Sequence, residues 1–422
     1  MTISADNEQR QVIIKRLLDK GVKIPCPESV EIDPEISTDR ISGNGVTIHT
    51  GCKLFGSGTL ISEGVELGYE APVTIENCQL GRDVKLKGGF YYDSTFLDGS
   101  GMGSAAQIRE ACLLEEGARG AHTVGLKQTI LMPFVTLGSL INFCDCLMSG
   151  GTDEKNHSEV GSSYIHFNYT PNQDKATASL IGDVPRGVML NQPAIFLGGQ
   201  GGLVGPVRIE YGTIVAAGSI VRKDVLKGNT MLFSQTSFTK SVPIYPGLFS
   251  NIKRIISLNT NYIAQLIALR RWYLDIRSLF IFGDSMREAL FKGAIEKIDM
   301  SIDERLKRLG QIAERMPRSI EIYRQTAGEK ASEIRISRKK EFHDRWGELK
   351  DIILGCLDLH GASSKREKLT SSIETKINQE ESDYIHIIKG LQKEDIDLGI
   401  SWLQGIVDNV NQEVWGRLPS FG

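Results

Sequence analysis

The sequence predicts a mainly β fold, a left-handed parallel β-helix built on hexapeptide repeats, followed by an all-α C-terminal domain. Three observations predict it. Aliphatic residues recur at every sixth position before residue 240, most of the 44 glycines fall before residue 250, and a helical spacing of apolar residues follows. A period of six fits neither an amphipathic helix nor an alternating strand, but it fits a triangular coil of short strands and turns.

Residues 1–30 are expected to form an N-terminal helical segment. Ser4 is a candidate N-cap for a short amphipathic helix, and Gly21 is a candidate stop, because glycine tolerates the conformation that ends helices. The first turn of a β-helix exposes unpaired strand edges. We therefore expect this helix to cap the coil.

Residues 31–242 are expected to form the coil. The residues that open successive units keep the six-residue spacing: Ile209, Val215 and Val221 in IEYGTI-VAAGSI-VRKDVL, and Ile48, Leu54 and Leu60 in an earlier run. Each is expected to point inward and to stack on its equivalents in neighbouring turns. Glycine, asparagine and aspartate at the corners accept backbone angles that other residues resist. The alternative, a glycine-rich β-sandwich, would not hold this register across three consecutive units.

Two segments interrupt the register, near 144–176 and 184–206. Long insertions in a solenoid are usually loops on one side and are often functional. In the first of them, strand alternation predicts that the side chains of Cys144 and Cys146 point the same way.

Residues 247–422 are expected to form an α-helical domain. Pro243, Pro246 and Gly247 mark the boundary, and the apolar spacing beyond it predicts several helices packed as a bundle or as hairpins. Charge-rich segments such as DERLKRLGQIAERM are expected to be solvated helix faces.

Composition limits the classes of function. A net charge of -3 gives no electrostatic case for binding nucleic acid. The sequence has no signal-peptide core and no stretch that approaches a membrane span. The seven cysteines are odd in number and scattered, so no disulfide framework is implied. A cytoplasmic protein with reduced thiols is expected.

Two consecutive stretches form an ordered series of motifs, HFNYTPNQDKATASLIGD and LVGPVRIEYGTIVAAGSIVRKDV. Its members are Asn168, Tyr169, Lys175, Thr177, Gly182, Asp183, the VGPV of 204–207, and Ala216-Ala217-Gly218. With this series, residues 31–240, about half of the chain, resemble the C-terminal acetyltransferase domain of the bifunctional UDP-N-acetylglucosamine pyrophosphorylase/glucosamine-1-phosphate acetyltransferase family.

The resemblance implies an acyltransferase that moves an acetyl group from acetyl-CoA, its co-substrate, to the amine of an amino sugar. In the family, an arginine and a lysine grip the phosphates of a sugar phosphate or sugar nucleotide, and the segment IREACLLEEGARGAHTVGLKQ places Arg109 and Lys127 in those roles. Eight further residues take implied roles. Asn142, Asn168, Tyr169 and Lys175 are expected to bind substrate, and Gly199, Gly201, Ala216 and Ala217 to bind acetyl-CoA. The resemblance also allows Mg²⁺ as a further cofactor, although no residue is assigned as a metal ligand. Family members form homotrimers, so a homotrimer is expected here.

The chain departs from the family pattern at several positions. Ungapped counting from Lys127 puts Ser139 where the family has its histidine base, and Asn142 where a substrate-binding tyrosine would lie. The family's coenzyme A arginine falls at Ser234, and Thr170-Pro171 replaces an Asp-Gly. No glycine-rich nucleotide loop precedes the coil, so we expect no nucleotidyl transfer by this chain alone.

Three hypotheses about function are therefore open. For acyl transfer, His157 is the preferred base and His166 the reserve, although either histidine is as readily an ordinary hydrogen-bonded loop residue. For a zinc-dependent hydratase on the same fold, His122, His157 and His166 would have to converge. The third is a non-catalytic sugar-nucleotide sensor or scaffold, in which the C-terminal helices could bind a protein partner.

Overall fold

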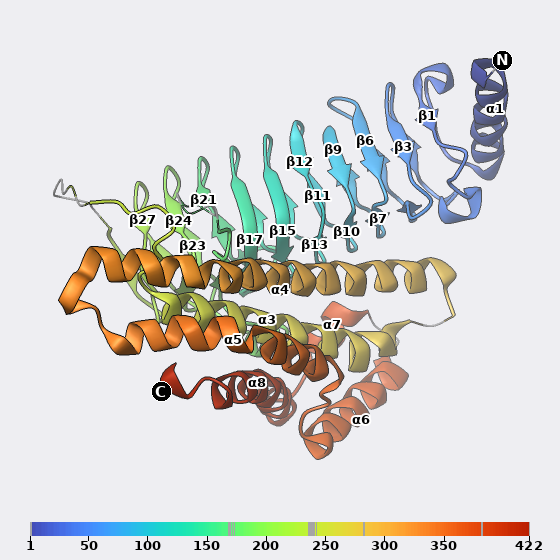
Figure 1. Ribbon diagram of the computed structural model, residues 1–422. Helices are drawn as coiled ribbons and strands as arrows, with labels where there is room; N and C mark the ends of the chain where they lie inside the picture. Colours follow the sequence, from blue (N-terminus) through green and yellow to red (C-terminus); the bar gives the residue numbers. More distant parts are fainter. Residues whose placement is uncertain are drawn as a thin grey trace.

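The computed structural model describes residues 2–167, 170, 172, 174–234, 241, 243–281, 283–380 and 383–421. It confirms the predicted fold class: a parallel β-helix of about 11 turns comes first, and a region of several helices follows. Figure 1 shows the strands stacked along one axis, with the C-terminal helices gathered on one side of them.

The coil has three faces, which we call faces I, II and III in the order in which each turn visits them. Face I consists of β2 (Thr47–Ile48), β5 (Glu66–Leu67), β8 (Lys85–Leu86), β11 (Gly101–Met102), β14 (Arg119–Gly120), β16 (Thr136–Leu137), β20 (Glu159–Val160), β23 (Phe196–Leu197), β26 (Ile214–Val215) and β28 (Met231–Leu232). Face II consists of β1 (Glu31–Ile32), β3 (Lys53–Phe55), β6 (Val73–Glu76), β9 (Gly89–Tyr92), β12 (Ala106–Ile108), β15 (Gly125–Leu131), β17 (Asn142–Met148), β21 (Ile165–Phe167), β24 (Gly202–Val204) and β27 (Ile220–Val221). Face III consists of β4 (Leu60–Ile61), β7 (Gln79–Leu80), β10 (Ser94–Phe96), β13 (Cys112–Leu114), β22 (Ser179–Ile181) and β25 (Arg208–Ile209), and β15 and β17 continue onto it around the corner.

The six-residue spacing fills the interior of the coil at five of the six predicted positions. The expectation is wrong at Leu60, which points outward to the helical region, while Ile61 takes the inward place. Ile209, Val215 and Val221 are buried, and Val221 pairs in register with Leu203 of the preceding turn. Many corners hold residues with a left-handed backbone, and Asp145, with a φ of 58°, is one of them. That corner lies between Cys144 and Cys146, so the expectation that both point the same way is wrong: Cys146 packs in the interior and Cys144 does not.

Helix α1 (Thr2–Lys20) lies across the N-terminal end of the coil (Figure 1). It ends at Gly21, whose φ is 106°. The Arg10 Nε donates to the Val30 carbonyl at 2.9 Å, and the Lys20 Nζ donates to the Ile41 carbonyl at 2.7 Å. The helix therefore occupies the place of the expected cap.

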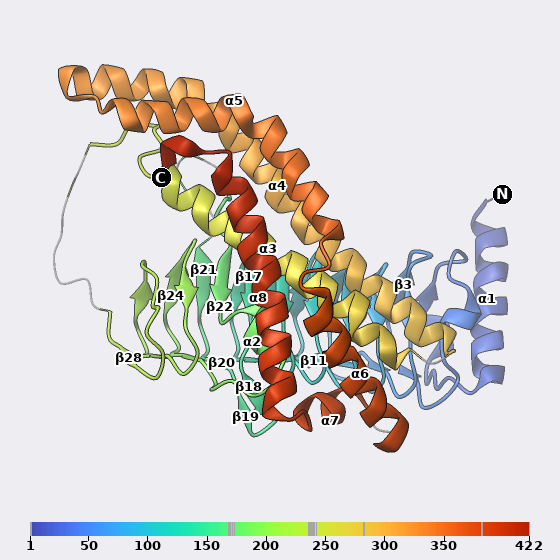
Figure 2. The same ribbon diagram turned by 90° about the horizontal axis from the view of Figure 1, so that it is seen from below.

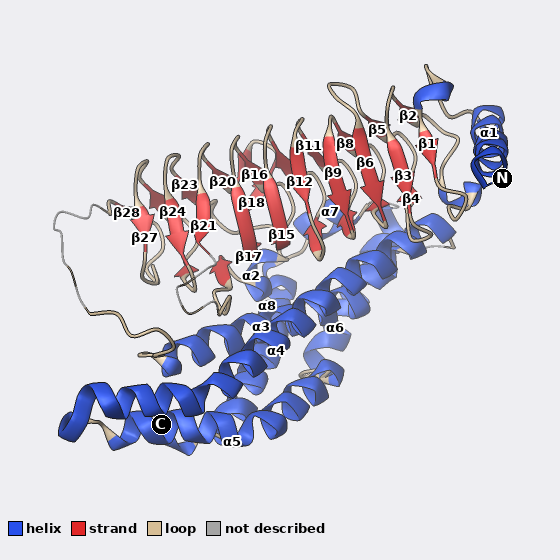
Figure 3. Cartoon of the chain, turned by 45° about the horizontal axis from the view of Figure 1, so that its top comes forward, coloured by secondary structure: helices blue, strands red, loops and turns tan. Residues whose placement is uncertain are grey.

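The C-terminal helices are α3 (Ile252–Asp275), α4 (Ser285–Ala327), α5 (Glu333–Gly355), α6 (Ser363–Glu380), α7 (Tyr384–Lys389) and α8 (Lys393–Gly416). Helix α4 is packed against α3 and α5, and α8 against α3 and α6. Figure 2 shows α4 and α5 as a long antiparallel pair, and Figure 3 shows the helices along one side of the coil. None of the described helices is long and apolar enough to cross a membrane.

Face III is the face that the helices cover. Helix α4 contacts β4, β7, β10 and β13, and α3 contacts β22. The aliphatic residues that point outward from the strands of face III join the hydrophobic core of the helical region: Leu60, Leu113, Ile130, Leu147 and Leu180. A strand that is buried on both sides carries apolar residues on both sides. The helices therefore share a core with the coil, which leaves faces I and II as its open sides.

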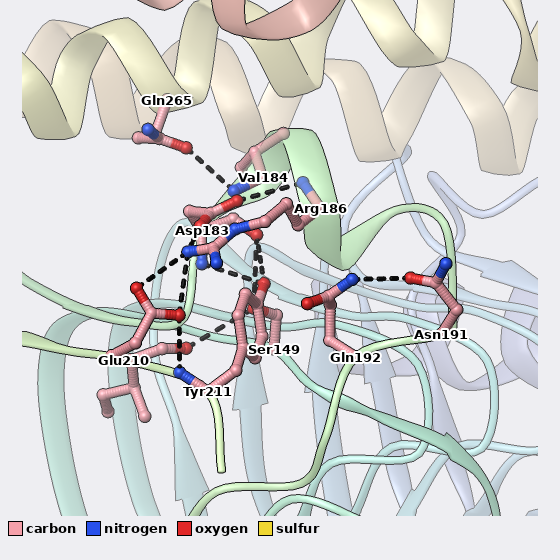
Figure 4. Close-up of polar contacts among 10 residues, drawn as sticks. Ser149, Asp183, Val184, Arg186, Asn191, Gln192, Glu210, Tyr211 and Gln265 are labelled. Atoms are coloured by element: carbon pink, nitrogen blue, oxygen red, sulfur yellow. Dashed lines mark hydrogen bonds and ion pairs between the residues drawn. The ribbon is translucent and has the colours of Figure 1, made fainter. Parts of the chain in front are cut away.

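The two interrupting segments take different forms. The first contains the end of β17, a hairpin of β18 (Gly151–Asp153) and β19 (Asn156–His157), and then β20 and β21, so the coil continues through it. The second begins with the short helix α2 (Val184–Gly187), whose contacts are drawn in Figure 4.

Helix α2 ties the coil to α3. The Asp183 side chain caps the helix, and the Arg186 guanidinium bridges Asp183 and Glu210, with a distance of 2.9 Å to Glu210 (Figure 4). On the other side, the Gln265 Oε1 of α3 accepts the first backbone N–H of α2 at 2.8 Å. This part of the second segment is therefore structural.

Candidate functional site

Three cations converge at the corner between faces II and III. Lys127 is the register partner of Cys144 in the next turn, and Arg109 lies one turn before Lys127. Burial raises the pKa of the Cys144 thiol to about 11, while the positive charges of Lys127, Lys175 and Arg109 all act on it in the opposite direction. The structure thus brings together three residues predicted separately as substrate ligands.

The carboxylate of Glu110 forms ion pairs with two of these cations. The Glu110 Oε1 lies 2.6 Å from the Lys127 Nζ, and the Oε2 lies 3.5 Å from the Arg109 Nε. Partial burial opposes its ionisation, but the hydrogen bond from Lys127 and the charges of both cations hold the pKa of Glu110 below its ordinary value. A second carboxylate at this corner, Asp145, is paired with Arg305, so the three cations and Glu110 leave positive charge for an anion such as a phosphate.

A histidine and a serine meet at the corner between faces I and II. The Ser139 Oγ lies 2.9 Å from the His122 Nδ1, and the Leu140 N–H donates to the His122 carbonyl from the next turn. His122 is exposed, and within the described residues its Nε2 has no protein partner. Ser139 is the position that counting assigned to the family's base, so the imidazole of the preceding turn lies beside the expected place.

Sequence reasoning placed His122 only in the zinc hypothesis. The signal that could have found the contact is the length of a coil turn, because His122 and Ser139 are separated by 17 residues. Residues one turn apart stack in a solenoid whatever their sequence neighbours are.

The same corner continues into the residues expected to bind acetyl-CoA. Gly199 lies beside Ser162 of the preceding turn, and its carbonyl accepts the Gly218 N–H, next to the exposed Ala217. A Cβ at Gly199 would lie 2.6 Å from the Ser162 carbonyl oxygen, and one at Gly201 would lie 2.7 Å from that of Ser219. Close packing of the backbone therefore requires glycine at both positions. Ala216 and Ala217 lie at the same corner of the next turn.

His166, the reserve base, lies inside the coil. Its Nδ1 is 2.5 Å from the Cys144 carbonyl oxygen and its Nε2 is 2.8 Å from the Ser179 Oγ. Burial lowers the pKa of His166 to about 4. Both ring nitrogens are engaged in a buried site, an arrangement that favours a structural role.

We expect His166 to make the protein acid-sensitive. The folded state holds this imidazole neutral, whereas the unfolded chain binds a proton at the ordinary histidine pKa. Stability is therefore lost as the pH falls from about 6.5 to about 4, by about 3 kcal/mol from this group. Urea unfolding at pH 7 and pH 4.5 should show a smaller difference for His166→Asn than for the unchanged protein, and equal differences would contradict this account.

The other predicted ligands lie in different places. His157 is at the end of the β18–β19 hairpin, where its Nδ1 is 2.8 Å from the Glu154 carbonyl oxygen. Asn142 is exposed on face II, between Gly125 and Ile165 of the adjacent turns. Asn168 and Tyr169 lie outside the described residues.

The histidines of the zinc hypothesis have separate partners. His122 bonds to Ser139, His157 to a backbone carbonyl, and His166 to groups inside the coil. In the described part of the chain, no three histidine, cysteine, aspartate or glutamate side chains are grouped so that they could hold a metal ion.

Comparison with known proteins supports the resemblance over the first half of the chain. No family model matches the chain. The chain is similar to three proteins named bifunctional protein GlmU: one from Thermotoga petrophila, 26% identical over 223 residues (52% of this chain, 44% of the relative); one from Lawsonia intracellularis, 28% identical over 218 residues (51% and 42%); and one from Burkholderia thailandensis, 27% identical over 235 residues (56% and 46%). The chain thus spans less than half of the length of these curated relatives.

Proposed function

We propose that this chain is an acyltransferase of the hexapeptide-repeat class that transfers an acetyl group from acetyl-CoA to the amine of a phosphorylated amino sugar. One observation carries the proposal. The cations at Arg109, Lys127 and Lys175 and the His122–Ser139 pair lie at the two edges of face II, an open face of the coil.

The dimensions of face II suit a sugar phosphate. His122 and Lys127 are five residues apart on the same turn, and a strand rises about 3.3 Å per residue, so their Cα atoms are at most about 16 Å apart. A lysine side chain and a single sugar ring can bridge such a span, with the phosphate at the cations and the amine near the imidazole. Asn142, which is exposed on the same face, is proposed to contact the sugar, as are Asn168 and Tyr169.

The proposed chemistry assigns a role to each edge of the face. Acetyl-CoA supplies an acetyl group activated as a thioester. The transfer forms an amide N–C bond and breaks the C–S bond, and the amine proton passes to the free Nε2 of His122 while the Ser139 hydroxyl holds the other ring nitrogen. The turns at Gly199, Gly201, Ala216 and Ala217 are proposed to contact the co-substrate.

His122 is a better candidate for the base than the two histidines proposed from sequence. His166 is enclosed in the coil, and His157 belongs to a hairpin beside face I, whereas the cations border face II. Turnover by purified full-length chain, given acetyl-CoA and glucosamine-1-phosphate and followed as release of the coenzyme A thiol, tests the proposal. Glucosamine without phosphate is the matched control substrate and should be acetylated far less efficiently.

The second candidate is a non-catalytic protein that binds sugar nucleotides. It is favoured by Ser234, which replaces the arginine that holds coenzyme A in the family. The Ser234 Oγ donates to the Ile220 carbonyl of the coil instead. Binding of UDP-N-acetylglucosamine without turnover of any amino sugar phosphate would support this second candidate and contradict the first.

Removing one cation should weaken substrate binding more than it slows the reaction. Lys127→Met is expected to raise the KM for glucosamine-1-phosphate by about 10- to 100-fold, because a charge-assisted hydrogen bond contributes about 1.5–3 kcal/mol. The kcat should change by less than about threefold, since the phosphate is remote from the reacting amine. Lys53→Met, which removes an exposed cation elsewhere on face II, is the control. An unchanged KM in Lys127→Met would exclude this residue from the phosphate site.

A further inference from the structure

A cavity of about 910 Å³ lies where the coil meets the C-terminal helices. Its walls come from the corner between faces III and I, from the tip of the β18–β19 hairpin and from the end of α3 with the segment that follows it. The N-terminal part of α4, the end of α6 and the start of α7 complete them. This volume is in the range of sites that bind small molecules. The candidate acyltransferase site on face II does not contribute to it.

One side of the cavity is a buried ion cluster. The Arg277 guanidinium bonds to Glu116 through two nitrogens, at 2.7 and 2.9 Å, and its Nη2 lies 3.3 Å from Glu115. The same guanidinium lies 4.7 Å from the ring centroid of Tyr273 and 3.9 Å from that of Tyr384. Among the described residues, the buried Arg277 Nε has no hydrogen-bond partner. The charge of Arg277 is thus already matched by two carboxylates, while one of its donors is unused.

The other charges of the lining are mainly negative. Four carboxylates line the cavity against two guanidiniums: Asp98, Glu116, Glu154 and Asp383 against Arg277 and Arg287. One oxygen of Asp98 accepts the Arg82 backbone N–H at 2.8 Å, and the other has no protein partner within the described part of the chain. Burial raises the pKa of Asp98 above its ordinary value. A positive charge beside this carboxylate would offset the energetic cost of burying its ionised form.

Aromatic rings supply a further part of the wall. Five of them line the cavity: Phe134, Tyr273, Phe280, Phe291 and Tyr384. The face of an aromatic ring attracts a cation, and its area binds an apolar body. Carboxylates combined with aromatic rings are the surroundings that a desolvated ammonium group needs.

We propose that this cavity binds an organic cation, an amine that carries an aromatic or alkyl body. The ammonium group is held at Asp98, whose second oxygen is unused by the described residues, and the body lies against Phe134 and Phe291. An anionic ligand is disfavoured, because the Arg277 charge is already used by Glu115 and Glu116 and no second buried cation is free among the lining residues described.

Three indole compounds of one size and different charge test this proposal on the full chain by calorimetric titration. Tryptamine is the cation, tryptophol the neutral analogue and indole-3-propionate the anion. Tryptamine is expected to bind at least tenfold more tightly than either of the others. Equal or tighter binding of tryptophol or indole-3-propionate would overturn the proposal, and so would the absence of binding by both tryptamine and octylamine.

Two variants locate the site. Asp98→Asn is expected to weaken tryptamine binding at least tenfold. Glu63→Gln is the matched control, because Glu63 occupies the equivalent corner two turns earlier and does not line the cavity. Phe291→Leu, which keeps the apolar volume and removes the ring, should weaken binding at least threefold and serves if Asp98→Asn fails to fold. Unchanged affinity in a folded variant would overturn the assignment.

Discussion

Replacing Arg305 by methionine is expected to lower the free energy of unfolding by about 3–5 kcal/mol, the cost of breaking a buried ion pair by removing one partner. The side chains of Arg305 and Asp145 are each 2% exposed, and their nitrogen and oxygen are 2.5 Å apart. The guanidinium also donates to the Gln128 Oε1 at 3.1 Å and to the Lys175 carbonyl at 3.0 Å. Methionine fills the space but leaves the Asp145 carboxylate buried without this counter-charge.

Chemical denaturation of the two proteins measures the loss. Arg318→Met is the control on the same helix, because Arg318 and its partner Glu321 are 65% and 54% exposed, and exposed pairs contribute about 0–1 kcal/mol. The double variant Arg305→Met with Asp145→Asn should regain part of the loss, since it removes the buried charge. A loss below about 1 kcal/mol in Arg305→Met would show that the pair does not join the coil to α4 in the way described.

The repeat made the coil predictable, because its period is imposed by the interior. Ile209 and its equivalents must point inward in every turn, although turns of unequal length shift the register, as at Leu60. The burial of face III under the C-terminal helices left a weaker signal in the sequence. In β13 the outward Leu113 lies between the inward Cys112 and Leu114, and such consecutive apolar residues indicate burial on both sides.

The packing of the helices on the coil could not be derived from their charges. Arg305 belongs to a segment expected to be a solvated face, and that expectation is wrong at this residue. Lys297, two helical turns earlier, is also buried and pairs with Asp93. Both cations meet carboxylates at left-handed corners of the coil, Asp93 and Asp145. Nothing in the local sequence of α4 shows that a charged residue faces a carboxylate more than a hundred positions away.

The candidate site was predictable in part, because the repeat of the coil places residues of successive turns side by side. Motif order identified Arg109, Lys127 and Lys175 individually, and the coil brought them to one corner. The His122–Ser139 contact depends on the length of one turn, which ungapped counting does not follow. The orientation of His166 could not be predicted either, because the β18–β19 hairpin and β20 separate it from the regular register before it.

Replacing His122 by alanine is expected to lower the kcat of acetyl transfer by about 100- to 10,000-fold, the contribution of a well-placed general base. The KM for glucosamine-1-phosphate should change by less than about threefold, because the phosphate is held by cations at the opposite edge of face II. Ser139→Ala should have a smaller effect on kcat of about tenfold, since the hydroxyl only orients the ring.

Two other histidine replacements make the result specific. His157→Ala removes the base preferred from sequence and should leave kcat within about threefold, because this ring lies in a hairpin beside face I. His49→Ala removes a half-buried histidine paired with Glu66 on an early turn and should behave in the same way. If His122→Ala retained most of its kcat while His157→Ala lost it, the base would be the hairpin histidine. The corner between faces I and II would then have no chemical role, although the cations at Arg109, Lys127 and Lys175 would still be tested independently by the KM of the phosphorylated substrate.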